Sequence, residues 1–128
     1  MKFSIGEFSR ITSLSIKSLR LYHEKEILIP SNVDEFTGYR YYNEMNIDVA
    51  RVIKILKEYD FSLAEIKDII DECSEESEMV EQLVKKKNEI QKKIDRYQNV
   101  ARSIELIIQK ETESKMKNEN DFEIEEKE

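Results

Sequence analysis

The sequence predicts a mainly α-helical protein with one small β-hairpin and a long helix in its C-terminal part. Three observations lead to this fold class. The 128 residues include two Gly and one Pro, which leaves little material for the many turns of an all-β fold. Apolar residues recur at helical spacing in short segments up to residue 72, and a seven-residue repeat of mostly apolar positions begins at Val80.

Two short helices open the chain. Ser4 and Glu7 have the spacing of a capping box, which predicts a helix over about residues 5–10. The polar residues that follow end this helix, and Ser15 is a good N-cap for a second helix over about residues 16–26. Two short helices joined by such a turn form a helix-turn-helix.

A β-hairpin is predicted between residues 31 and 42. Pro30 ends the helical pattern, and the segment that follows holds Gly38 and three Tyr. Aromatic residues after a Gly turn are typical of hairpin strands. Gly38 can supply the positive φ that the turn needs.

Two more helices follow the hairpin. Asn43 can cap a third helix over about residues 44–58. A second capping box, at Ser62 and Glu65, opens a fourth helix over about residues 63–71. The expected apolar face of the third helix comprises Met45, Val49, Val52, Ile53 and Leu56. The order of helix, helix, hairpin, helix and helix predicts a winged helix-turn-helix with a β-hairpin wing over residues 1–72, which we call the head.

A coiled-coil helix is predicted over residues 75–111, which contain no Gly or Pro. Because this helix is far longer than the head and cannot bury its stripe alone, we expect a second copy to pair with it. The alternative is a helix that folds back on its own domain. Residues 112–128 lose the repeat and are acidic, which predicts a disordered tail or linker. The repeat places nine residues at a and d positions, the predicted seam: Val80, Leu83, Lys87, Ile90, Ile94, Tyr97, Ala101, Ile104 and Ile108.

The net charge of −7 argues against nucleic-acid binding when the chain is taken as a whole. The charge is unevenly distributed, however. Residues 1–57 carry nine Lys and Arg against seven Asp and Glu, a net charge of +2, whereas residues 58–128 carry a net charge of −9. A basic head with an acidic remainder is compatible with DNA binding by the head.

Several classes of protein are excluded by composition. One Cys and one His provide neither a disulfide framework nor a metal cluster, and no nucleophile–base pair is apparent. We therefore expect neither an enzyme nor a bound metal or cofactor. The chain has no run of eighteen apolar residues and its N-terminus does not resemble a signal peptide, so we expect a cytoplasmic protein without a membrane span.

A set of motifs in order and spacing over residues 3–70 resembles the MerR family of bacterial transcription regulators, whose dimerisation helix follows at the same place. This chain departs from the family pattern at Ser13, which replaces the usual Gly of the first turn, at Leu21, where a second aromatic is common, and at Asp60, which replaces another Gly. The motifs are Ile5-Gly6-Glu7, Thr12-Ser13-Leu14-Ser15, Leu19-Arg20-Leu21-Tyr22, Gly38-Tyr39-Arg40-Tyr41-Tyr42 and Phe61-Ser62-Leu63-Ala64-Glu65-Ile66.

The resemblance implies a homodimer joined by an antiparallel two-helix coiled coil. It implies that two heads bind a pseudo-palindromic promoter between its −35 and −10 elements. Family members activate or repress by distorting this double-stranded DNA, and activation allows RNA polymerase to engage both elements. The alternative is a coiled-coil interaction or adaptor protein whose winged-helix head does not bind DNA.

The second helix is expected to enter the major groove with its N-terminal residues facing the bases. Candidates for base contact are Ile16, Lys17, Ser18 and Leu21. Candidates for phosphate contact are Arg20 and Tyr22 on the same helix, Tyr39 and Arg40 in the wing (backbone or minor groove), and Arg51, Lys54 and Lys57 on the third helix.

Other roles stay open for several of these residues. The three cations on the third helix could form an ordinary solvated face. Arg20 and Arg40 could be structural, with Glu24, Glu7 or Asp34 as ionic partners. At least one of Tyr41 and Tyr42 is expected in the core.

The sequence does not identify an effector. A thiolate metal site needs at least two soft ligands, and Cys73 is the single Cys, with acidic neighbours that disfavour its thiolate. We interpret Cys73 as a partly buried residue at a hinge. Two explanations stay open for the sensing function: a ligand-binding domain that follows residue 128 in a longer protein, or a signal received from another protein or at a small pocket near the coil.

Overall fold

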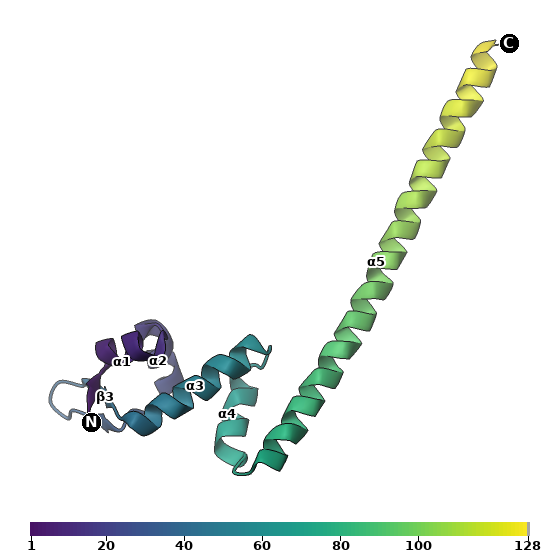
Figure 1. Ribbon diagram of the computed structural model, residues 1–128. Coiled ribbons are helices and arrows are strands. Elements are labelled where there is room, and N and C mark those ends of the chain that lie inside the picture. Colours follow the sequence, from purple (N-terminus) through teal and green to yellow (C-terminus); the bar gives the residue numbers. More distant parts are fainter. Residues whose placement is uncertain (128) are drawn as a thin grey trace. The chain divides into compact units, whose positions relative to one another are not determined.

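The computed structural model describes the backbone of residues 1–127 and the side chains of residues 1–117. It confirms a mainly helical fold with a small sheet and one long C-terminal helix (Figure 1). The chain forms two compact units, of which the first ends at Gln82. The elements in order are β1 (Phe3–Ser4), α1 (Ile5–Thr12), α2 (Ile16–Glu24), β2 (Asn32–Val33), β3 (Arg40–Tyr42), α3 (Glu44–Glu58), α4 (Leu63–Glu72) and α5 (Glu76–Lys127).

Side-chain caps define where the head's helices begin. The predicted capping boxes are present at α1, where the Glu7 amide donates to Ser4 Oγ over 3.2 Å, and at α4, with Ser62 and Glu65. Ser15 caps α2 as predicted, its Oγ accepting from the Ser18 amide at 3.0 Å. The Asn43 cap of α3 is confirmed and forms part of a third capping box with Asn46. These bonds satisfy amides that a helix start leaves unpaired.

Left-handed residues mark the turns between elements. Ser13 ends α1 with φ 62°, and Asp60 lies between α3 and α4 with φ 69°. Gly38 adopts φ 74° in the wing, as predicted. A non-Gly residue costs roughly 1–2 kcal/mol in this region, so Ser13 and Asp60 keep turn geometries that Gly would adopt without this cost.

The wing belongs to a three-stranded antiparallel sheet with strand order β1-β3-β2. The predicted hairpin is formed by β2 and β3, with Val33 opposite Arg40. Strand β1 was not predicted; it pairs Phe3 with Tyr42 and is followed at once by α1. The wing is therefore hydrogen-bonded directly to the start of the helix-turn-helix.

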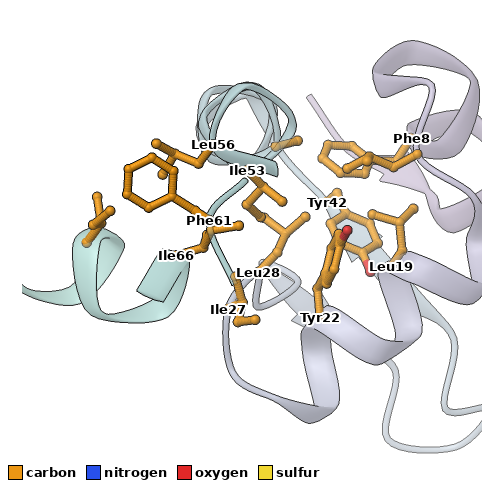
Figure 2. Packing of buried hydrophobic residues seen from close by; sticks show 13 residues of the cluster. Phe8, Leu19, Tyr22, Ile27, Leu28, Tyr42, Ile53, Leu56, Phe61 and Ile66 are labelled. Atoms are coloured by element: carbon orange, nitrogen blue, oxygen red, sulfur yellow. The ribbon is translucent and has the colours of Figure 1, made fainter. Parts of the chain in front are cut away.

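The head is built around a continuous apolar core that includes residues from α1, α2, α3, α4 and β3. Figure 2 shows Leu28 and Ile53 between two groups of core side chains, with Phe8 and Tyr42 in one group and Phe61 in the other. The rings of Phe8 and Tyr42 are stacked, with centroids 4.3 Å apart and planes 10° apart. Tyr42 is thus the core tyrosine expected of the Tyr41–Tyr42 pair.

The expected apolar face of α3 is partly wrong. Met45 is 76% exposed, and Ala50, Ile53 and Leu56 are the buried residues of this helix. Met45 lies in the first turn of α3, where a side chain extends toward the helix start and the core no longer covers it.

Helix α5 continues beyond the predicted end at residue 111. It has 52 residues and reaches Lys127, so its backbone is helical through most of the segment predicted as a disordered tail. The segment contains neither Gly nor Pro and is rich in Glu and Lys, which are good helix formers. The prediction for residue 128 and for the side chains after Lys117 lies outside the described residues. Among the helices described, none has the length and apolar character needed to cross a membrane.

Candidate nucleic-acid interface

Helix α2 presents most of its predicted DNA-contacting residues on one exposed face. Lys17 and Arg20 are exposed, and Ile16 and Leu21 are each 37% exposed. Ser18 is half-buried, and its Oγ accepts a hydrogen bond of 2.9 Å from the hydroxyl of the Ser15 cap. A surface hollow of about 550 Å³ runs along this face, lined by Ile16, Lys17, Ser18, Arg20, Leu21 and Glu24.

The prediction that Tyr22 contacts phosphate is wrong. Tyr22 is 1% exposed, so it is a core residue and not a surface contact for phosphate. Leu19 and Tyr22 are three residues apart and therefore share the buried face of α2. The place of Tyr22 on a helix expected in the major groove suggested a phosphate contact, whereas its spacing from Leu19 indicates a core position.

A closely hydrogen-bonded turn holds the tip of the wing. Asp34 Oδ1 accepts from the amides of Phe36 at 2.8 Å and Thr37 at 3.0 Å. The Gly38 amide donates to the Asp34 carbonyl at 2.8 Å, and the Asp34 amide donates to the Tyr39 carbonyl at 2.9 Å. The backbone amides of Thr37 and Phe36 hold the pKa of Asp34 below its ordinary value. The turn thus fixes the position from which the side chain of Tyr39, which is 65% exposed, extends from the wing.

Residues of α2 and of the wing line a common cleft of about 480 Å³. Arg20 of α2 and Tyr39 and Arg40 of the wing all line it. Within residues 1–117 neither arginine forms an ion pair. Of the partners considered from sequence, Glu7 is bound in the α1 cap and Asp34 in the wing turn. Two guanidinium groups without carboxylate partners on one cleft are a suitable surface for phosphate.

Arg40 has a partner that sequence reasoning missed. Its Nε donates to Nδ1 of His23, on the last turn of α2, over 2.8 Å. Both side chains are half-buried. These residues are seventeen positions apart, and no local pattern indicates the contact.

The three cations of α3 do not line the cleft or the hollow. Arg51 pairs with Asp48 at 3.7 Å, but both side chains are more than 70% exposed, so the pair contributes little to stability. Lys54 is half-buried, and Lys57 Nζ lies 6.0 Å from the centroid of the Tyr22 ring. Phosphate contact by these residues stays a prediction.

The seam of α5 is exposed in the single chain. Of its nine members Ile90 is half-buried and the others are exposed. The large apolar side chains among the exposed members have exposed fractions from 38% for Leu83 to 64% for Tyr97. Apolar side chains repeated along a solvated helix are typical of a surface that pairs with another helix. Lys86, beside the seam, is 7% exposed and its Nζ lies 3.2 Å from Glu89 Oε2.

Cys73 lies at the C-cap of α4 and is half-buried, as expected. Burial raises the pKa of its thiol, and the carboxylates of Glu78 and Glu72 raise it further. In the part of the chain that the structure describes, no group of three or more His, Cys, Asp or Glu is placed to hold a metal ion.

Comparison with known proteins decides the family. Residues 3–73 match the family model described as "MerR HTH family regulatory protein". The chain belongs to the MerR family. Among its MerR-family relatives, the multidrug-efflux transporter 1 regulator of Bacillus subtilis is 32% identical over 105 residues, which are 82% of this chain and 37% of that protein. The chain spans less than half the length of the first curated relatives it matches.

Solved MerR-family structures agree with the fold. The N-terminus of MtaN, the Bacillus subtilis multidrug transporter activator, has a TM-score of 0.73 at 26% identity; the match covers 83% of this chain and 97% of that one. A cryo-EM structure of an EcmrR–DNA complex has a TM-score of 0.62 at 30% identity, covering 71% of this chain and 32% of that one.

Proposed function

We propose that this MerR-family chain is a sequence-specific, DNA-binding transcription regulator. The observation that carries the proposal is the cleft where Arg20 of α2 meets Tyr39 and Arg40 of the wing, next to the exposed face of α2. The basic side chains of the cleft are free to bind phosphate, so they suit contact with the DNA backbone. The exposed N-terminal residues of the neighbouring helix α2 suit contact with the bases. A related structure at 30% identity is a DNA complex, which supports the proposal.

The second part of the proposal is a homodimer joined by α5. Its exposed seam supports pairing with a second copy, and two copies place two heads on a pseudo-palindromic promoter. As the family resemblance implies, the regulator acts on RNA polymerase by distorting the DNA between the −35 and −10 elements. Such a role places the protein in the cytoplasm and involves no catalysis.

DNA binding is tested with the full chain, by fluorescence anisotropy on random and selected duplexes over a range of salt. Arg40→Ala should weaken binding to all sequences and lower the salt slope by about one, because one phosphate contact is lost. Lys17→Ala should instead change base preference. The matched control is Arg102→Ala, which removes an exposed charge from α5 and should leave the slope unchanged. Absence of binding by the unmodified chain at low salt would favour the adaptor alternative.

Dimerisation is tested by light scattering coupled to size-exclusion chromatography. The double variant Ile94→Asp, Ile104→Asp places charges in the seam, where both isoleucines are about half exposed in the single chain. It should elute as a monomer, since an unpaired charge is costly in a buried seam. Ser103→Asp places one such charge on an exposed position outside the seam and should stay dimeric. A monomeric unmodified chain would refute this part of the proposal.

A further inference from the structure

The single histidine of the chain joins the two elements that form the cleft. His23 lies in the last turn of α2, and its Nδ1 accepts a hydrogen bond of 2.8 Å from Arg40 Nε in β3. Arg40 lines the cleft together with Arg20 and Tyr39. The contact therefore connects the helix-turn-helix to the wing at the surface where both are proposed to contact DNA.

The chemistry of the two groups determines what this contact does. A guanidinium group is always protonated and only donates, so His23 Nδ1 is the acceptor and carries no proton. The bond is made by Nε, and the terminal nitrogens of Arg40 keep their donors. Because guanidinium is planar, a bond at Nε restrains the plane in which those donors point.

We propose that His23 is a positioning residue for DNA binding, which orients the Arg40 guanidinium in the cleft before DNA arrives. This inference rests on the proposed function. A long arginine side chain on a solvated wing loses rotamer freedom when it binds phosphate. With the His23 bond already made, part of that loss occurs on folding, and the wing is also held in a defined position relative to α2.

The test compares two replacements of His23 in the full chain. His23→Asn places an amide oxygen near the position of Nδ1 and keeps the acceptor, whereas His23→Leu has similar bulk and no acceptor. On the duplex selected by the unmodified chain, His23→Leu should weaken binding roughly three- to tenfold. His23→Asn should stay within about twofold of the unmodified chain. A purely steric role would not distinguish the two variants in this direction.

A double-mutant cycle identifies the residue through which His23 acts. In the Arg40→Ala background, His23→Leu should have no further effect on affinity, because the group that it positions is gone. Equal binding by His23→Leu and the unmodified chain would overturn the inference, and so would additive losses in the cycle. If His23→Leu unfolds the head, His23→Gln takes its place in the test. The amide oxygen of Gln lies one methylene farther from the backbone than that of Asn, so the His23→Gln variant should bind DNA more weakly than the His23→Asn variant. Equal DNA binding by these two variants would overturn the inference.

The two proposals fail in different ways. If the unmodified chain binds no DNA at low salt, the proposed function is wrong and the positioning role falls with it. If the unmodified chain binds with a normal salt slope and His23→Leu equals it, only the positioning role is wrong. The NMR resonance of the Arg40 Nε–H gives a measurement that needs no DNA. This proton should exchange slowly with water in the unmodified chain and fast in His23→Leu. Equal exchange rates in the two proteins would overturn the inference.

Discussion

Replacing Tyr42 by Phe should stabilise the head, although Tyr42 is fully buried. Its hydroxyl is the buried side-chain atom that lacks a hydrogen-bond partner among the described residues, and burial raises the pKa of the phenol. An unsatisfied buried hydroxyl costs about 1–3 kcal/mol. Phe keeps the ring that stacks on Phe8 at 4.3 Å and removes the hydroxyl, so we expect a gain of about 1 kcal/mol in the free energy of unfolding.

Guanidinium unfolding of the full chain measures this gain. The chain has no Trp, so near-UV circular dichroism of the tyrosines reports the packing of the head. In thermal unfolding, a gain of 1 kcal/mol in the free energy of unfolding corresponds to a rise of about 4–8 °C in the Tm of a domain of this size. The control is Tyr41→Phe: this half-buried tyrosine faces Lys2, whose Nζ lies 4.4 Å from the ring centroid, and its replacement should change stability by less than about 0.5 kcal/mol. A Tyr42→Phe variant less stable than the unmodified chain would refute the reasoning, because the hydroxyl would then form a favourable bond.

Three other predictions follow from local geometry. Gly6→Ala should stabilise α1 by about 0.5–1 kcal/mol in the same assay, since a Cβ there meets no atom within 4 Å and Ala favours helix; a loss of stability would contradict this. Ser13→Gly should raise the free energy of unfolding by about 0.5 kcal/mol, because Gly adopts the left-handed φ of 62° without strain, whereas Ser13→Ala should not raise it. The raised pKa of Cys73 keeps its thiol protonated near neutral pH, so iodoacetamide should react more slowly with the folded chain than with the unfolded chain at pH 8. Equal rates would show that Cys73 is an ordinary exposed thiol.

Helix starts were predictable because their determinants are local. A cap residue and its partner are three positions apart, so the boxes at Ser4 and Ser62 are readable without tertiary information. The same holds for Gly38, whose positive φ is a property of one residue in one turn. The ends of helices were less well predicted: α5 passes residue 111 because nothing in its composition stops it.

The missed features depend on pairs that are distant in sequence. Strand β1 has two residues, too few for a period of two to be recognised, and it forms only because β3 lies beside it. The bond between His23 and Arg40 joins residues seventeen positions apart. Tyr22 was misassigned for another reason. Its place on a helix expected in the major groove suggested a phosphate contact, but Tyr22 lies three positions after Leu19 on the buried face of that helix and is 1% exposed.

Strand β3 explains how the core and the proposed DNA surface depend on each other. Arg40 and Tyr42 are two positions apart on this strand and therefore point to the same face. At one end of this face Tyr42 stacks on Phe8 of α1, and at the other Arg40 bonds to His23 of α2. The two helices of the helix-turn-helix thus each hold one end of a three-residue strand. A change in the packing of Phe8 should therefore alter the position of Arg40, and with it DNA affinity, without touching the DNA-facing surface.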